Sequence, residues 1–394
     1  MDILIITNFC SDFSATDNDR FLYLAKMLSK EHNVEIVTSD FCHEKKSHRN
    51  VTAYDWSPIK ITFLSEPGYK KNVCIKRFYS HIKWGKSVKK YLSKRAKPDI
   101  IYCAVPSLSG PLAAAKYCEK NGVKFVIDVQ DLWPEAFKMV LNIPVVSKLL
   151  FLPFESLANG IYKRADAICA VSDTYVQRAL RSNKKCSSGH SVFLGTDLSK
   201  FDNNSEGQAM LEKADDEVWL AYCGTLGSSY DLTTAFDALE KLKNDKLKFV
   251  VMGDGPKFEE FKEYASSRSL NVHFTGRIPY DRMCATLSKC DININPISHG
   301  AAQSIINKHA DYAASGNPVI STQESLEYRN LVESFNMGYN CSNGDSEGMA
   351  KAISTLVEDI ELRKEMGKNA RTCAEQKFDR RNSYGELAEV ILEA

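Results

Sequence analysis

The sequence contains no Cys-x-x-Cys pair and no cluster of His and Cys at zinc spacing, although twelve of its 394 residues are cysteines. This absence excludes the common structural zinc motifs. The cysteines stand mostly in apolar runs, as in 101–104, so we expect free thiols in the core of a protein from a reducing cytoplasm.

Long apolar runs are also missing, since none approaches the roughly 20 residues that an α-helix needs to span a bilayer. The chain enters its first apolar run at 2–7 without the layout of a signal peptide. We therefore expect a cytoplasmic, soluble protein, which still leaves room for contact with a membrane surface.

Glycine is absent from the loop 8–19, which follows the first expected strand. Ligands of parallel α/β folds bind at the carboxyl ends of strands, so this loop is a candidate binding segment, and we include Asn18 in it. Without glycine it cannot form the G-x-G-x-x-G turn of dinucleotide-binding proteins. The sequence thus argues against a Rossmann dehydrogenase.

Charge is distributed unevenly over a chain whose length favours two domains. Residues 1–195 carry 29 Lys and Arg against 18 Asp and Glu, whereas residues 196–394 carry 22 against 32. A basic first half suits an anionic surface or substrate. The alternative is that the two halves only attract each other.

Acidic residues are missing altogether from 67–98, which contains eleven Lys and Arg. Apolar residues recur there at approximately helical spacing, with Trp84 beside them. A basic amphipathic helix that carries Trp is typical of a membrane-surface segment, so we predict contact with an anionic membrane through 70–97. The alternative is a helix packed on its own sheet with a solvated basic face. No motif that reads nucleic acid accompanies the charge, and we expect no nucleic-acid partner.

Strand-like runs alternate with helical runs along the whole chain, which predicts an α/β fold with parallel sheets. The polar segment 202–217 is the best candidate for a linker between two such halves. In the first half, the run 124–128 leads into a loop with Asp131, Trp133 and Glu135. Two carboxylates and a Trp after a buried strand indicate an edge that binds an acceptor.

The segment 304–320 predicts one helix with its ends defined by sequence: Ser304 as N-cap, and Gly316 as the residue that terminates it before Asn317-Pro318. Ser304, Lys308 and Asp311 fall at i, i+4 and i+7 and share a face. A helix N-terminus with a nearby Lys suits a diphosphate, and a carboxylate further along suits ribose hydroxyls. The alternative is an ordinary capped surface helix.

Five motifs in order resemble the retaining glycosyltransferase family 4, which has the GT-B fold. They are Val192 to Asp197, Gly224-Thr225-Leu226-Gly227, Gly253-Asp254-Gly255, Phe274-Thr275-Gly276-Arg277, and Ser304 to Ile320. In addition, 128–135 is similar to the D-x-x-D-L-W-P-E signature of the bacterial O-antigen and capsule subset.

The resemblance implies two Rossmann-like parallel-sheet domains that face a cleft. Their expected bounds are 1–200 for the acceptor domain, 201–375 for the nucleotide-sugar domain, and 376–394 for a C-terminal helix that crosses back. For the donor site it implies Gly227, Gly253, Gly255, Arg277, Ser304, Asn307, Lys308 and Asp311. For the acceptor site the candidates are Asn18, Arg20, Asp131, Trp133 and Glu135, where Arg20 and Glu135 are the weaker ones because either could be an ion-pair partner.

Departures from the family pattern affect the charges of the site. The family's E-x7-E pair falls on Gln303 and Asp311, and its usual Arg and Lys in the second half fall on Thr225 and Tyr230. Lys308 is then the evident cation for the diphosphate. We take Lys308, Asp131 and Gln303 as the catalytic candidates.

The expected reaction is the transfer of a sugar from a nucleoside diphosphate sugar, with uridine as the family's commonest base, to a polyprenyl-diphosphate-linked acceptor at the inner face of the cell membrane. It would retain the anomeric configuration and contribute to surface polysaccharide. We expect no cofactor and no metal, because no carboxylate cluster resembles a divalent-ion site. The alternatives are a nucleotide-sugar 2-epimerase of the same fold and a non-catalytic nucleotide-sugar-binding subunit.

Overall fold

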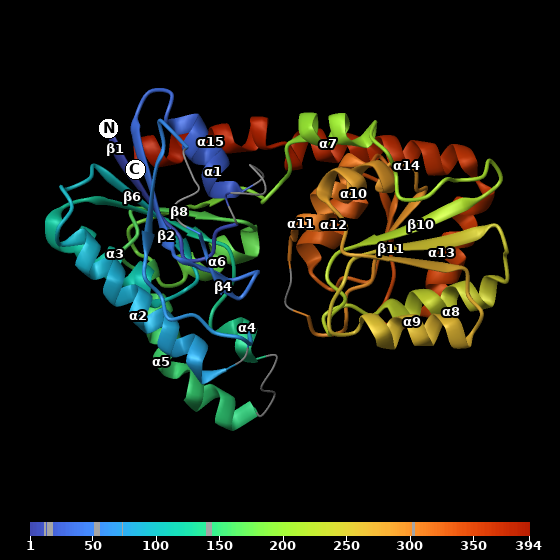
Figure 1. Cartoon of the computed structure of the whole chain (residues 1–394), viewed down its shortest axis with the longest axis horizontal. Helices are drawn as coiled ribbons and strands as arrows, with labels where there is room; N and C mark the ends of the chain where they lie inside the picture. The colour runs from blue at the N-terminus through green and yellow to red at the C-terminus, as the bar shows by residue number, and fades with distance from the viewer. Residues whose placement is uncertain (12, 14–18, 51–55, 73, 139–143, 302–303) are drawn as a thin grey trace. The chain divides into compact units, whose positions relative to one another are not determined.

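The structure is a computed structural model of residues 1–394, and it describes all of them except 12, 14–18, 51–55, 73, 139–143 and 302–303. The chain divides into two compact units (Figure 1). The first comprises Met1–Phe193 with Ser383–Ala394, and the second comprises Leu194–Asn382.

Within its described residues, the first unit is built on a parallel sheet of seven strands in the order β5-β2-β1-β6-β7-β8-β9. The strands are β1 (Asp2–Ile6), β2 (Asn33–Ser39), β5 (Lys60–Leu64), β6 (Ile100–Val105), β7 (Lys124–Val129), β8 (Ala167–Ala170) and β9 (His190–Ser191). A short hairpin, β3 (Phe41–Cys42) and β4 (Ser47–His48), follows β2. Strands β1, β6 and β7 are buried along nearly their whole length, because helices cover both faces of the sheet.

The helices of the first unit lie in two layers (Figure 1). One layer contains α2 (Ile75–Leu92), α3 (Ser109–Asn121) and α5 (Pro144–Tyr162), which pack in that order. The other contains α1 (Arg20–Leu28) and most of α15 (Arg380–Glu393), whose apolar side chains share one core cluster with Ile3 and Ile5 of β1. The remaining helices are α4 (Glu135–Lys138) and α6 (Asp173–Leu180).

The second unit repeats this plan with a parallel sheet in the order β12-β11-β10-β13-β14-β15. The strands are β10 (Val218–Cys223), β11 (Leu247–Met252), β12 (Val272–Gly276), β13 (Ile292–Asn295), β14 (Val319–Ser321) and β15 (Gly338–Asn340). The strand order reverses between β10 and β13, which makes their carboxyl ends the point where parallel α/β sheets bind ligands.

Helices again cover both faces of the second sheet (Figure 1). Helix α8 packs against α9 and α13, and α11 packs against α14 and α7. The helices are α7 (Leu198–Ser205), α8 (Leu232–Leu242), α9 (Phe258–Ser267), α10 (Tyr280–Leu287), α11 (Asn307–Ala314), α12 (Leu326–Ser334), α13 (Ser346–Glu358) and α14 (Ile360–Cys373), followed by a π-helical turn, Ala374–Phe378. The predicted fold class, two Rossmann-like parallel-sheet units, is confirmed.

Helix α2 corrects one detail of the sequence analysis. Trp84 is fully buried and packs over Gly110 of α3, so it does not belong to the exposed face of the basic segment. The exposed apolar side chains of α2 are instead Ile75, Tyr79 and Ile82, at i, i+4 and i+7. No helix among the described residues is both long enough and apolar enough to cross a membrane.

Candidate functional site

The helix α11 carries Lys308 and Asp311, two of the side chains predicted for the donor site, and it begins later than the sequence predicts. Its first residue is Asn307, and Ile306 is the extended residue before it. The imidazole Nδ1 of His309 accepts the backbone N–H of Ile306 at 3.3 Å. The predicted end is confirmed, since Gly316 follows with a φ of +69°, which favours glycine.

Ser304 is not the N-cap of α11, which corrects the prediction. Its hydroxyl donates to Oε2 of Glu327 at 2.6 Å, and its backbone carbonyl accepts the side-chain amide of Gln323. Both interactions fix the segment before α11 to the chain around α12. Ser304 is buried in this arrangement, so the free amide groups expected at 304–307 are reduced to those at the start of the helix proper.

A buried polar network supports the start of α11, and the sequence pattern did not reveal it. Nδ2 of Asn295, the last residue of β13, lies 3.2 Å from Nε2 of His309 and 3.1 Å from Oε1 of Gln323. The His309 ring stacks on Tyr328 at 3.6 Å between centroids. Burial lowers the pKa of His309 well below its ordinary value, so the ring is neutral and can accept from Ile306.

Lys308 is the main electrostatic feature of the second unit. Only 7% of the residue is exposed, and its ammonium nitrogen has no hydrogen-bond partner among the described residues. The nitrogen lies 4.0 Å from the ring centroid of Tyr222 and 3.9 Å from that of Tyr230. Burial lowers the pKa of Lys308 to about 7. Two aromatic faces stabilise a cation only in part, so an anion in hydrogen-bond distance would raise this pKa and bind strongly.

Tyr230 occupies the position at which the family pattern has a lysine. Its ring contacts the ammonium group of Lys308. It follows the loop after β10, in which the N–H of Tyr230 donates to the carbonyl of Gly227 at 3.1 Å. Gly227 thus shapes a turn at the same sheet edge as Lys308. The side chain of Lys308 also approaches Gly224, where an added Cβ would lie 3.1 Å from the ammonium nitrogen.

Asp311 lies one helical turn after Lys308 and has a different environment. Its Oδ1 accepts the hydroxyl of Tyr280 at 2.8 Å, and that hydroxyl lies 2.9 Å from the hydroxyl of Thr196. Burial raises the pKa of Asp311 to about 6, while the hydrogen bond from Tyr280 acts in the opposite direction. The nearby charge of Arg380 and a hydrogen bond from Thr196 also act to lower the pKa of Asp311, and the carboxylate is ionised at neutral pH.

Gly253 and Gly255 are required by packing between two loops. An added Cβ at Gly253 would clash with the carbonyl oxygen of Gly224, and one at Gly255 would clash with that of Leu226. The N–H of Leu226 donates to the carbonyl of Asp254 at 3.0 Å. The two glycines therefore hold the loop after β11 against the loop after β10.

The other predicted donor residues lie on the same unit but are less constrained. Arg277 is exposed directly after β12, and Asn307 is exposed as the first residue of α11. Gln303 lies outside the described residues.

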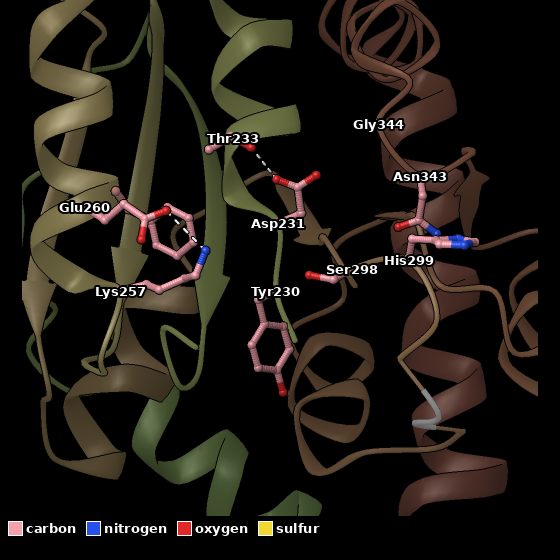
Figure 2. A pocket seen from close by; sticks show the side chains of 10 residues that line it. Tyr230, Asp231, Thr233, Lys257, Glu260, Ser298, His299, Asn343 and Gly344 are labelled. Atoms are coloured by element: carbon pink, nitrogen blue, oxygen red, sulfur yellow. Dashed lines mark hydrogen bonds and ion pairs between the residues drawn. The ribbon is translucent and has the colours of Figure 1, made fainter. Parts of the chain in front are cut away.

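A cavity of about 590 Å³ lies beside this edge (Figure 2). It is lined by Tyr230, Asp231, Thr233, Lys257, Glu260, Phe261, Ser298, His299, Asn343 and Gly344. Its charged groups already have partners: Lys257 pairs with Glu260 at 3.1 Å, His299 with Glu324 at 2.6 Å, and Asp231 accepts hydrogen bonds from the hydroxyls of Thr233 and Thr234. Lys308 has no such partner, so we place the candidate anion site at Lys308 and not in this cavity.

In the first unit, the loop after β7 holds three of the predicted acceptor residues. Oδ1 of Asp131 accepts the N–H of Leu132 at 2.9 Å, and Oδ2 accepts the indole N–H of Trp133 at 3.1 Å. Burial raises the pKa of Asp131. Glu135 accepts from Nε of Arg178 at 2.5 Å, so it has the ion-pair role that the sequence left open.

Arg20 departs from its predicted role in acceptor binding. Its guanidinium pairs with Asp128 through Nε at 2.8 Å and through a second nitrogen at 3.1 Å, and it also donates to the carbonyls of Val192 and Phe193. The hydroxyl of Tyr384 accepts from it at 3.2 Å. All three nitrogens of this buried side chain are occupied, which gives Arg20 a structural role. Asn18 lies outside the described residues.

Around Trp133 the structure brings together residues that the sequence analysis did not connect: Phe9, His43, Tyr69, Arg77 and His81. They come from the ends of β1 and β5, the β3–β4 hairpin and the start of α2. Only their common place after parallel strands could have indicated the cluster. In the part of the chain that the structure describes, no group of His, Cys, Asp or Glu has the arrangement of a metal site.

Comparison with known proteins agrees with this architecture. Residues 204–372 match the family described as "Glycosyl transferases group 1". An uncharacterized glycosyltransferase of Methanocaldococcus jannaschii is 22% identical over 62% of this chain and 63% of its own length. A protein of Escherichia coli K12 described as "Putative colanic acid biosynthesis glycosyl transferase WcaI" is 22% identical over 73% of this chain and 72% of its own.

Solved structures resemble the whole chain. The Anabaena protein HepE in complex with UDP superposes with a TM-score of 0.73 at 16% identity, over 100% of both chains. The lipopolysaccharide outer core galactosyltransferase WaaB has a TM-score of 0.67 at 16% identity, over 100% of this chain and 99% of its own. Residues 204–372 of the second unit are thus similar to the glycosyl transferases group 1 family, and the chain has the GT-B fold.

Proposed function

We propose that the protein transfers a sugar from a nucleoside diphosphate sugar to a lipid-linked acceptor in bacterial surface polysaccharide synthesis, with retention of the anomeric configuration. The observation that carries the proposal is the buried ammonium of Lys308, unpaired among the described residues, at the point where the strand order reverses. Burying an unpaired ammonium group costs free energy, and a bound anion would offset that cost. Uridine is the preferred base, because the similar HepE was crystallised with UDP.

In this reaction, the bond between the anomeric carbon and the donor's diphosphate breaks, and its electron pair moves to the phosphate oxygen. Lys308 stabilises the charge that develops there, since a positive group in a dry site acts more strongly than in water. The acceptor hydroxyl forms the new bond to the anomeric carbon, and its proton passes to the departing phosphate. Asp311 binds the ribose hydroxyls, and the exposed backbone near Arg277 holds the base.

Asp131 orients the acceptor hydroxyl in our proposal. Each of its oxygens already accepts one hydrogen bond within the loop, which leaves lone pairs for a second donor. Burial raises the pKa of Asp131, and the two internal bonds act in the opposite direction. The same two bonds hold the carboxylate in one orientation, so we assign it the positioning of the hydroxyl. Gln303 would contact the donor sugar through neutral hydrogen bonds.

The proposal is tested by incubating the protein with UDP-sugars, with and without polyprenyl-diphosphate-linked sugar acceptors. We expect UDP release and a glycosylated lipid only when the lipid is present, with the anomeric configuration of the donor retained in the product. An epimerised sugar formed without lipid would instead identify a 2-epimerase. Tight UDP binding with no product under any condition would identify a non-catalytic subunit.

The membrane contact is a second part of the proposal. Helix α2 exposes Lys83, Lys86, Lys89 and Lys90 beside the apolar residues Ile75, Tyr79 and Ile82. Each basic residue near an anionic bilayer contributes about 1 kcal/mol. Replacing these four lysines by Glu should therefore weaken binding to phosphatidylglycerol-containing liposomes at least tenfold in a sedimentation assay.

The matched control replaces four exposed lysines elsewhere in the same unit by Glu. These are Lys116, Lys120, Lys124 and Lys163. The control changes the net charge equally but should leave most liposome binding intact. Equal losses in both variants would show that binding follows net charge alone, and that α2 has only a solvated basic face.

A further inference from the structure

The first unit contains an arginine enclosed by aromatic rings at the carboxyl edge of its sheet. Arg77 lies in the first turn of α2, and its guanidinium carbon is 4.6 Å from the ring centroid of Trp133. The ring centroids of Tyr69 and Phe9 lie 5.5 Å and 5.6 Å from the same guanidinium carbon. These three residues follow β7, β5 and β1, so separate strand ends form the enclosure.

Arg77 lacks the carboxylate partner that Arg20 and Arg178 of this unit have. Only 8% of the residue is exposed. One terminal nitrogen donates to the carbonyl of Asn72 at 2.8 Å, whereas Nε has no hydrogen-bond partner among the described residues. Arg20 and Arg178, in contrast, pair directly with Asp128 and Glu135. No carboxylate in the described parts of the chain forms an ion pair with Arg77.

Three further basic side chains surround the same point. The His81 ring stacks on Trp133 at 5.5 Å and is 3% exposed, and its Nε2 has no hydrogen-bond partner among the residues described. Nδ1 of His43 lies 2.6 Å from the hydroxyl of Tyr69 and 3.3 Å from the ammonium of Lys46. Burial and the positive neighbours lower the pKa of both histidines to about 3. Both rings are therefore neutral at pH 7, and the charges of the cluster come from Arg77 and Lys46; an anion bound at this point would offset the cost of burying them.

The nearest carboxylate that acts on Arg77 is that of Asp131. Its oxygens are held by Leu132 and Trp133, as described above, and it forms no ion pair with the guanidinium. Asp131 therefore does not neutralise Arg77 through an ion pair. It also places the candidate acceptor residue next to the cation.

We infer that Arg77, with His81, His43 and Lys46 around it, binds the diphosphate that joins the acceptor sugar to its lipid. This inference rests on the proposed function. The position fits, because Ile75, which is 88% exposed, stands two residues before Arg77 on the helix that we place on the membrane. At a rise of about 1.5 Å per residue, a head group at that surface lies within reach of the guanidinium. An arginine also matches phosphate oxygens in geometry as well as in charge.

Soluble short-chain probes test the inference by isothermal titration calorimetry. We expect farnesyl diphosphate to bind at least tenfold more tightly than farnesol, and Arg77→Gln to abolish this difference. The control Arg181→Gln, at an exposed position on the end of α6, should preserve it. Inorganic pyrophosphate, titrated alone, shows whether a free phosphate is enough for binding or the lipid is required.

Thermal unfolding of each variant separates binding from folding. If Arg77→Gln does not fold, His81→Phe retains the ring that stacks on Trp133 and removes only the imidazole nitrogens, and it should weaken farnesyl diphosphate severalfold. Equal binding of farnesyl diphosphate and farnesol by the wild type, or no effect of a folded Arg77→Gln, would overturn the inference. UDP binding measured on the same samples reports on the proposed function separately, because UDP needs Lys308 and not Arg77.

Discussion

Replacement of Lys308 by Met should lower kcat about 100- to 1,000-fold and leave the protein folded. Removing one preorganised group that stabilises transition-state charge costs about 2.7–4 kcal/mol in other enzymes, which corresponds to this range. Met resembles the lysine stem in length and fills the space between Tyr222 and Tyr230. The measurement is the initial rate of UDP release at saturating donor and acceptor.

The same variant should be at least as stable as the wild type. Since burial lowers the pKa of Lys308 to about 7, the folded state binds a proton less readily than the unfolded chain, whose ordinary value is 10.5. The lowered pKa reduces the free energy of unfolding. The reduction is complete below pH 7 and disappears as the pH rises toward 10.5. The melting temperature of Lys308→Met should therefore exceed that of the wild type most clearly at pH 7 or below.

A lysine of the neighbouring cavity provides the matched control. Lys257 pairs with Glu260, and its replacement by Met should leave kcat within a factor of about two. Near-normal turnover of Lys308→Met would remove Lys308 from the mechanism. A fall in both activity and stability would mean that the ammonium has a structural role.

Replacement of Asp311 by Asn should raise the KM for the donor about 10- to 100-fold, with a smaller effect on kcat. Asn keeps an oxygen that can accept from Tyr280 but loses the charge that strengthens hydrogen bonds from the ribose hydroxyls, which are worth about 1.5–3 kcal/mol. The measurement is kcat/KM for the donor between pH 5 and pH 9.

The pH profile gives this prediction a second readout. In the free wild-type enzyme, kcat/KM should rise as Asp311 ionises at about pH 6 and fall as Lys308 loses its proton at about pH 7. Asp311→Asn should remove the acid limb. Tyr280→Phe should move that limb to higher pH, because the hydrogen bond from Tyr280 lowers the pKa of Asp311. An acid limb that persists unchanged in Asp311→Asn would assign it to another group.

The sequence was sufficient where one local rule determines the structure. The apolar runs 2–7 and 124–128 coincide closely with β1 and β7, because continuous apolar runs suit strands that are covered on both faces. The end of α11 was predictable because Gly316 supplies a backbone conformation that other residues avoid. Lys308 and Asp311 were predicted to share a helix, and both lie on α11.

Features that depend on tertiary partners were not predictable. Ser304 has the chemistry of an N-cap, but Glu327 and Gln323, distant in sequence, compete for its polar groups. Trp84 fits the pattern of a membrane-facing residue, yet the small residue Gly110 leaves a place for it under α3. The contact of Tyr280 with Asp311 and the enclosure of Arg77 join segments that no short motif relates.

A crystal structure with UDP is the most direct test of the nucleotide site at Lys308 and Asp311. We expect the diphosphate within hydrogen-bond distance of the ammonium nitrogen of Lys308, and the ribose hydroxyls at the carboxylate of Asp311. A nucleotide bound elsewhere, for example among Lys257, His299 and Asn343, with Lys308 still enclosed by Tyr222 and Tyr230, would contradict this expectation.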